Sequence, residues 1–194
     1  MVNMGVNELL FAAINKGEKA EVARLLKEGA NPNAKDAQGR TTIIVAAAKG
    51  NAEIIRTLIK AGAKVDAKDE QGRTALTKAV SLGKVEAAKT LVAAKADLEA
   101  KDRGGWTPLM WAAELGKWDA AKLLIRKGAN VNAKDNAGWT PLVHAFPDMH
   151  IAGAEFLISK GARADTTDQH QLNPLRLAIK HSDHKMAKLL DKLE

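Results

Sequence analysis

An aspartate recurs at a fixed interval of 33 residues along this chain, and this spacing constrains the fold more than any other feature. The five aspartates are Asp36, Asp69, Asp102, Asp135 and Asp168. Each opens a related segment, which is clearest in Asp102-Arg-Gly-Gly-Trp-Thr-Pro-Leu and Asp135-Asn-Ala-Gly-Trp-Thr-Pro-Leu. A fixed period of this length is typical of stacked repeats, in which each module packs mainly against its neighbours. The sequence therefore predicts an elongated solenoid rather than a domain with one central core.

The period divides the chain into six modules with the same predicted structure. Their boundaries are 1–35, 36–68, 69–101, 102–134, 135–167 and 168–194. In module four, Thr107 followed by Pro108 predicts a helix start, because threonine caps helices and proline fits their first turn. A second helix is expected from Trp118 until Gly128, a residue type that readily ends helices. The residues expected on the buried face of the first helix are Leu109, Ala112, Ala113 and Gly116.

The Thr-Pro-Leu and Gly-Ala segments that recur at this period resemble the ankyrin repeat. The resemblance covers essentially the whole chain and implies an all-α solenoid of helix-turn-helix pairs, linked by hairpin-like fingers at right angles to the helices. It also implies a binding protein without catalytic activity. The framework residues differ between modules, which is typical of a natural protein, and the Asn-Ala-Lys-Asp links resemble those of bacterial ankyrin proteins. An engineered descendant remains an alternative.

Some modules depart from the common pattern. Lys95 occupies the helix-ending glycine position of module three, so we expect a non-glycine residue with positive φ there, at a cost of roughly 1 kcal/mol. Pro147 falls where the first helix of module five should continue, so we expect a short or kinked helix and fast hydrogen exchange in residues 144–153. Module six replaces its finger glycine by Gln171 and is expected to act as a polar cap.

Composition excludes several functional classes. No apolar run reaches the length of about 18 residues that a membrane span needs, and no secretory signal is visible, so we expect a cytoplasmic protein. A periplasmic location stays open if a signal peptide has been removed. The absence of cysteine excludes a disulfide framework, a thiol nucleophile and a zinc ribbon. We expect a monomer when the protein is alone.

The sequence offers little to support catalysis or metal binding. It contains none of the nucleotide-binding, metalloprotease or serine-hydrolase motifs, so we expect no enzymatic activity and no cofactor. His144 and Asp148 form the nearest approach to a catalytic pair, but Pro147 separates them. His181 and His184 have a spacing that suits two metal ligands, yet no third ligand is evident, so we expect no metal site.

Residues at two fixed offsets from the aspartates define a candidate surface for a partner protein. The residues four positions after the aspartates are Arg40, Arg73, Trp106, Trp139 and Leu172, and those nine positions after are Val45, Lys78, Trp111, His144 and Leu177. Trp111 is expected opposite the buried face of its helix, and Trp106 beside Trp139 on the next module. Tryptophan is strongly enriched at binding hot spots. We predict a patch of Trp106, Trp111 and Trp139, flanked by Glu114, His144, Arg40, Arg73 and Lys78.

Other interpretations of the aromatic and apolar residues stay open. The patch tryptophans could instead brace the fingers against the helices. We expect Trp118, at the start of a second helix, to pack structurally. Met110 and Leu115 are expected to point sideways, towards neighbouring modules.

The charge pattern motivates rival functions. Lysines precede four of the aspartates at the expected finger tips: Lys35, Lys68, Lys101 and Lys134. We expect solvated tips whose lysines are neutralised by the adjacent aspartates. With a net charge of +7, however, such a row also suggests electrostatic binding of nucleic acid or an anionic membrane. Interspersed charges of both signs favour a protein partner instead, and an inhibitory or scaffolding subunit of a larger assembly is a further alternative.

Overall fold

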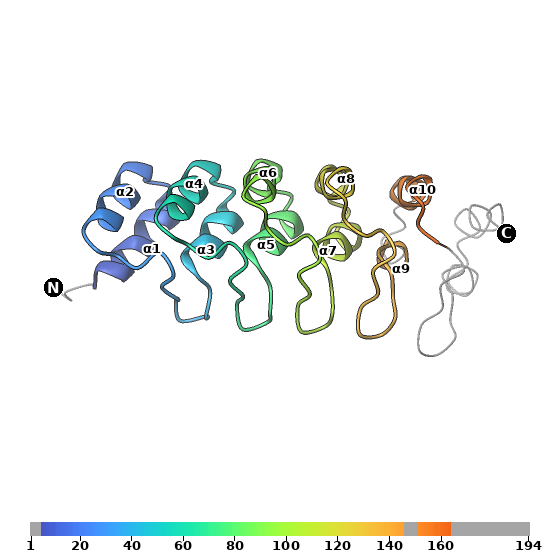
Figure 1. Cartoon of the computed structure of the whole chain (residues 1–194), viewed down its shortest axis with the longest axis horizontal. Coiled ribbons are helices and arrows are strands. Elements are labelled where there is room, and N and C mark those ends of the chain that lie inside the picture. The colour runs from blue at the N-terminus through green and yellow to red at the C-terminus, as the bar shows by residue number, and fades with distance from the viewer. Residues whose placement is uncertain (1–4, 146–150, 164–194) are drawn as a thin grey trace.

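The computed structural model describes residues 5–145 and 151–163, and in these ranges it consists of helix pairs stacked in a single row (Figure 1). The pairs are α1 (Val6–Lys16) with α2 (Lys19–Lys27), α3 (Thr42–Lys49) with α4 (Ala52–Lys60), α5 (Ala75–Ser81) with α6 (Val85–Ala93), α7 (Pro108–Glu114) with α8 (Trp118–Arg126), and α9 (Pro141–His144) with α10 (Ile151–Ser159). The odd-numbered helices contact one another along the row, as do α2, α4, α6 and α8. This arrangement confirms the predicted all-α repeat solenoid.

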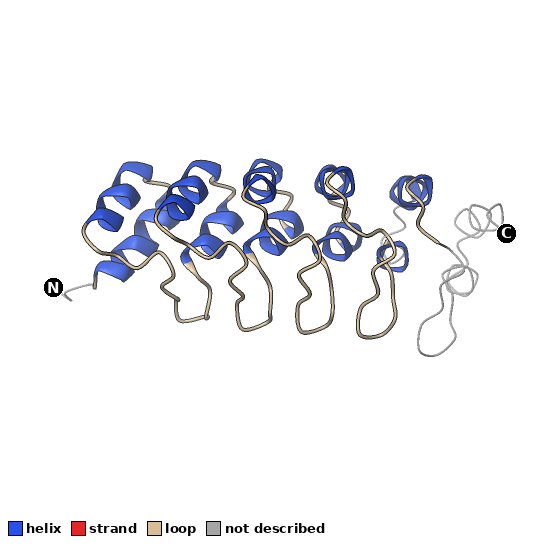
Figure 2. Cartoon of the chain, viewed as in Figure 1, coloured by secondary structure: helices blue, strands red, loops and turns tan. Residues whose placement is uncertain are grey.

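A loop joins each even-numbered helix to the next odd-numbered helix, and we call this loop a finger. Figure 2 shows the fingers extending from one side of the row, away from the even-numbered helices. Within the described ranges the only β-type pairing is an isolated antiparallel bridge between Lys35 and Thr41, at the two sides of one finger. The fingers are therefore turns held by individual hydrogen bonds rather than sheets.

The predicted signals mark the helix ends, although not all of them form the expected capping bond. The side chain of Thr107 accepts a hydrogen bond from the backbone N–H of Met110, and Thr74 caps α5 in the same way. Thr41 and Thr140 precede α3 and α9 without capping them, and in the described part of the chain their buried hydroxyls find no hydrogen-bond partner. At the helix C-termini, Lys95 adopts φ 63°, as predicted for a residue in a glycine position.

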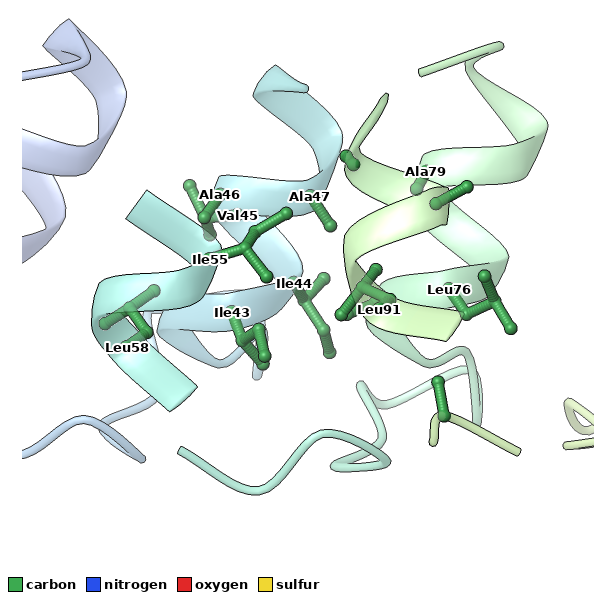
Figure 3. Close-up of a cluster of buried hydrophobic side chains, with 14 of the residues drawn as sticks. Ile43, Ile44, Val45, Ala46, Ala47, Ile55, Leu58, Leu76, Ala79 and Leu91 are labelled. Atoms are coloured by element: carbon green, nitrogen blue, oxygen red, sulfur yellow. The ribbon is translucent and has the colours of Figure 1, made fainter. Parts of the chain in front are cut away.

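The core lies between the odd-numbered and even-numbered helices as two buried clusters, and the partly buried Trp118 and Ile125 pack against both. Figure 3 shows part of one cluster, where Ile43 and Ile44 of α3 lie near Ile55 and Leu58 of α4. These side chains are at most 1% exposed, and each contributes about 1.5–3 kcal/mol by leaving water. In module four the predicted inward residues Leu109, Ala112 and Ala113 are buried as expected. The stack therefore provides a rigid base for the fingers.

Several expectations concern residues outside the described ranges. They are the disturbance and fast exchange around Pro147, the pairing of His144 with Asp148, the finger change at Gln171, the pair His181 and His184, and the cap from residue 168 onward. Within the described ranges, no helix is long and apolar enough to cross a membrane. Five helix pairs of the six predicted modules fall in these ranges, and the sixth module remains a prediction.

Candidate functional site

The repeated aspartate closes the turn of its own finger through one carboxylate oxygen. In each described finger, Oδ1 accepts the backbone N–H groups of the residues two and four positions later, at 2.8 to 3.0 Å. The aspartates that do this are Asp36, Asp69, Asp102 and Asp135. A short carboxylate side chain suits such a turn, because it can bond to backbone groups close in sequence. This turn explains why aspartate recurs with the period of the fold.

In modules two and three, the second oxygen of the same carboxylate accepts a hydrogen bond from an arginine. Arg40 Nε donates to Asp36 Oδ2 at 2.7 Å, and Arg73 Nε donates to Asp69 Oδ2 at 3.1 Å. Burial alone would raise the pKa of the Asp36 carboxyl, but hydrogen bonds from Arg40 and the backbone outweigh it, and the pKa is lowered. Asp36 therefore stabilises the fold above its unfolded pKa, and this contribution is lost as pH falls through the lowered value.

In modules four and five the donor to the second oxygen comes from the helix instead. Trp111 Nε1 donates to Asp102 Oδ2 at 2.9 Å, and His144 Nε2 lies 2.9 Å from Asp135 Oδ2. Both donors stand nine residues after their aspartate, at the positions that Val45 and Lys78 occupy in modules two and three. The donor is thus a finger residue in modules two and three and a helix residue in modules four and five. In modules four and five, the finger position four residues after the aspartate is a tryptophan instead of an arginine.

Trp106, Trp111, Trp139 and His144 form a connected group of rings, which we call the aromatic cluster. The ring centroid of Trp106 lies 4.8 Å from that of Trp111 and 4.0 Å from that of His144. The ring centroid of Trp139 lies 5.8 Å from that of His144. The tilted contacts, with interplanar angles of 50° to 56°, are favourable for aromatic rings. The cluster therefore joins modules four and five, with His144 between two tryptophans.

His144 is the buried centre of the cluster. Its side chain is 2% exposed, while its Nδ1 lies 3.2 Å from Glu114 Oε2 and its Nε2 faces Asp135. The carboxylate of Asp135 is only 4% exposed, so His144 is placed between a buried and a more accessible carboxylate. His144 was predicted to flank the patch, but it is buried against the tryptophan rings, because it occupies the donor position of its module.

Arg40, Arg73 and Lys78 lie in the two preceding modules, on the same side of the stack. The pKa of Lys78 is lowered, first by burial and then by the positive charge of Arg73; the nearby Asp69 opposes this lowering, and Arg40 has the smallest effect. Arg73 and Arg40 therefore both repel the ammonium of Lys78, while Asp69 attracts it. All three side chains are partly buried. The predicted site residues thus divide into an aromatic group and a basic group.

Leu82 and Leu115 are exposed leucines near the candidate surface, and the sequence pattern did not single out Leu82. Leu115 is 40% exposed and Leu82 is 50% exposed, so a substantial part of each side chain faces solvent. Leu115 follows Trp111 by four residues and Leu82 follows Lys78 by four, which places each leucine on the same helix side as its partner. That spacing was a usable signal. Each leucine is the C-cap residue, just past the last residue of its helix.

Two of the finger lysines bond to backbone carbonyls rather than to the adjacent aspartates. Lys68 Nζ donates to the carbonyl of Lys101, and Lys101 Nζ donates to the carbonyl of Lys134, both at 2.8 Å. The expectation that neighbouring aspartates neutralise them is therefore wrong for these two lysines. The aspartate oxygens are already occupied within their own fingers, whereas the next finger presents a carbonyl one module away. These lysines tie successive fingers together.

Replacing Trp111 by phenylalanine is expected to lower the free energy of unfolding by about 1–2 kcal/mol, because Asp102 Oδ2 loses its donor. Adding Trp106→Arg should then cost less than it does in the unchanged protein, since an arginine four residues after the aspartate serves this oxygen in modules two and three. Urea unfolding of the two single variants and the double variant measures the coupling. If the losses of stability are additive, an arginine at position 106 does not replace Trp111 as the donor to Asp102 Oδ2.

Comparison with known protein families agrees with this architecture. A family model described as ankyrin repeats (3 copies) matches residues 9–102 and residues 95–168. The two matches overlap, and together they include the aromatic cluster and the basic group. No curated protein matches the chain in sequence.

Proposed function

The chain belongs to the ankyrin-repeat family, whose members generally mediate protein–protein interactions, and from this premise we propose that it binds a partner protein through the aromatic cluster. Repeats of this family are typically non-catalytic interaction modules. The partner would contact the side of the stack that carries the fingers and the odd-numbered helices. Modules four and five would provide the centre of the contact.

The observation that carries this proposal is the arrangement of three partly buried tryptophans on two adjacent modules. Trp106 and Trp139 each lie against His144, and Trp106 also lies against Trp111. Rings held in place before binding lose little conformational entropy when a partner arrives, so their buried area contributes efficiently to affinity. The indole N–H of Trp111 already bonds Asp102, and this ring would therefore contribute its apolar surface rather than a hydrogen bond.

The other predicted site residues would surround this centre. Glu114 is partly exposed beside His144, so it can contact a partner while it positions the imidazole. Arg40, Arg73 and Lys78 extend the surface towards the N-terminal modules. His144 itself would act as a positioning residue, because 2% exposure leaves no room for a direct contact.

The bracing interpretation predicts a different outcome for the same residues. The bonds that hold Trp111 and His144 to the finger aspartates show how the cluster can stiffen the fingers. Bracing and binding are compatible, since a braced ring still presents its free face. Experiments can distinguish them. If the tryptophans only brace the fingers, their removal lowers the stability of the fold but leaves the affinity of the folded protein for its partner unchanged.

We expect Trp106→Ala to weaken binding of a physiological partner, captured on the full chain and then purified, by at least tenfold, or about 1.4 kcal/mol. Calorimetric titration gives the Kd, and circular dichroism gives the melting temperature. Ile55→Val is the matched control: Ile55 is fully buried away from the cluster, so this variant lowers stability and leaves the Kd unchanged. A Trp106→Ala protein with lowered melting temperature and unchanged Kd would establish bracing and reject the proposed binding centre.

The electrostatic alternative is less well supported. Lys68 and Lys101 donate to backbone carbonyls of neighbouring fingers, so these ammonium groups do not form an open row for phosphates. Retention on heparin or DNA at about 150 mM salt would nevertheless favour that alternative. If a captured partner is an enzyme, its activity in the complex separates an inhibitory role from a scaffolding role.

A further inference from the structure

The side of the stack that carries the fingers changes its chemistry from basic to apolar along the chain. In modules two and three it presents Arg40, Arg73 and Lys78. In module four it presents Trp106, Trp111 and the exposed Leu115, and Leu82 lies at the boundary in module three. We call this combined surface the graded face. A partner that fits it must itself change from acidic to apolar over a short distance.

The basic part of the graded face has more positive than negative charge. Arg40 and Arg73 are paired with Asp36 and Asp69, whose oxygens also accept backbone N–H groups. Within the described residues, the ammonium of Lys78 makes no hydrogen bond and no ion pair. Arg73 and Arg40 add to the lowering of its pKa that burial causes, while Asp69, which Arg73 already contacts, opposes it. An acidic side chain from outside the protein would supply a counter-charge in direct contact with this ammonium.

Resting on the protein-binding function above, we propose that the graded face binds an extended partner segment with acidic residues over Arg40, Arg73 and Lys78, and apolar residues over Leu82, Trp111 and Leu115. The acidic end of the segment lies over modules two and three. Its apolar end lies against the aromatic cluster. Charge complementarity fixes the direction of the segment, and the apolar contact supplies most of its affinity.

The repeat spacing sets the spacing of the partner's residues. Packed helices lie about 8–10 Å apart, and an extended chain rises about 3.3 Å per residue, so one module corresponds to about three residues. An acidic residue opposite Lys78 and an apolar residue opposite Trp111 should therefore stand about three residues apart. A peptide of about 12 residues, roughly 40 Å long, would cover the graded face.

A single-stranded nucleic acid would fit this surface less well. Bases can stack on tryptophans, but the phosphates would then pass the carboxylates of Asp102, Glu114 and Asp135, which lie around the rings. Like charges so close are unfavourable. A protein segment avoids this repulsion, because its charges need only face the basic part.

The test is a selection from displayed random peptides of about 12 residues against the immobilised full chain, followed by measurement of Kd for the enriched peptides. We expect sequences with Asp or Glu about three residues from an aromatic or aliphatic residue. Lys78→Glu should weaken them at least tenfold, and Leu115→Ser at least threefold. Lys60→Glu is the control of equal charge change on the exposed side of α4, and it should leave the Kd unchanged.

The outcomes separate this inference from the proposed function. Enriched peptides that lack acidic residues but lose affinity with Trp106→Ala would overturn the acidic-apolar segment and leave protein binding at the aromatic cluster in place. Peptides insensitive to both Lys78→Glu and Trp106→Ala would overturn both. Failure to enrich any peptide would reject a linear segment, while capture of a folded partner would still test the proposed function. Tight binding of oligothymidine at about 150 mM salt would overturn the inference in favour of nucleic acid.

Discussion

Replacement of His144 by alanine is expected to lower the free energy of unfolding by about 3 kcal/mol, because it leaves a buried carboxylate without its partner. Among the described residues, Asp135 Oδ2 accepts a hydrogen bond from His144 alone, and the Asp135 side chain is 4% exposed. The substitution also removes the ring that lies 4.0 Å from Trp106 and 5.8 Å from Trp139. Urea unfolding followed by circular dichroism measures the loss.

The Asp135→Asn variant distinguishes two causes of the stability loss in His144→Ala: the buried carboxylate left without a partner, and the ring contacts that are removed. An asparagine can still accept the two backbone N–H groups of the finger turn through its oxygen, but it carries no charge. The cost of His144→Ala should therefore fall by at least about 1.5 kcal/mol in this background. An equal cost in both backgrounds would assign the whole effect to the cavity beside the tryptophans.

The second large effect is expected at Gly153 in α10, where alanine should lower the free energy of unfolding by about 2 kcal/mol. A Cβ atom at this position would overlap Cζ2 of Trp118, which packs against both parts of the hydrophobic core. Alanine is otherwise the better helix residue by about 1 kcal/mol, so the contact must reverse the sign of the usual glycine-to-alanine change. The same unfolding measurement applies.

Trp118→Ala provides the control for this prediction. Without the indole, the added methyl group has space, and Gly153→Ala should then stabilise the protein by up to about 1 kcal/mol. The double variant thus tests whether the effect of Gly153→Ala on the free energy of unfolding changes sign, not merely whether it becomes smaller. A loss of stability from Gly153→Ala in both backgrounds would mean that the contact with Trp118 is not its cause.

The fold, and the grouping of several rings on neighbouring modules, could be predicted from the sequence. Thr107 with Pro108 marked the start of α7, the inward positions Leu109 and Ala112 are buried, and Lys95 adopts the predicted positive φ. Each of these depends on residues within one or two helical turns. Trp106, Trp111 and His144 were grouped because the period aligns equivalent positions of neighbouring modules, and the structure brings their rings together.

The connections within the site were not accessible in this way. The period alone could not show that the donor to the finger aspartate changes from Arg73 to Trp111, because two positions in the module can reach the same oxygen. Nor could it show that Lys68 bonds to the next finger rather than to Asp69. These outcomes depend on which side-chain donors are long enough to reach a given oxygen. They also depend on which acceptors are not already bonded within their own module when the modules stack.

By itself, the sequence determined the repeat, the helix ends and the direction of the buried faces, since these follow from local chemistry repeated at a fixed interval. Only the tertiary structure decided that His144 is buried between Asp135 and Glu114, that Leu82 and Leu115 stay exposed, and that Gly153 leaves space for Trp118. Each of these depends on contacts, or on missing contacts, between modules. Stacking sets the distance between modules, and so it decides which polar groups meet and which apolar side chains remain uncovered.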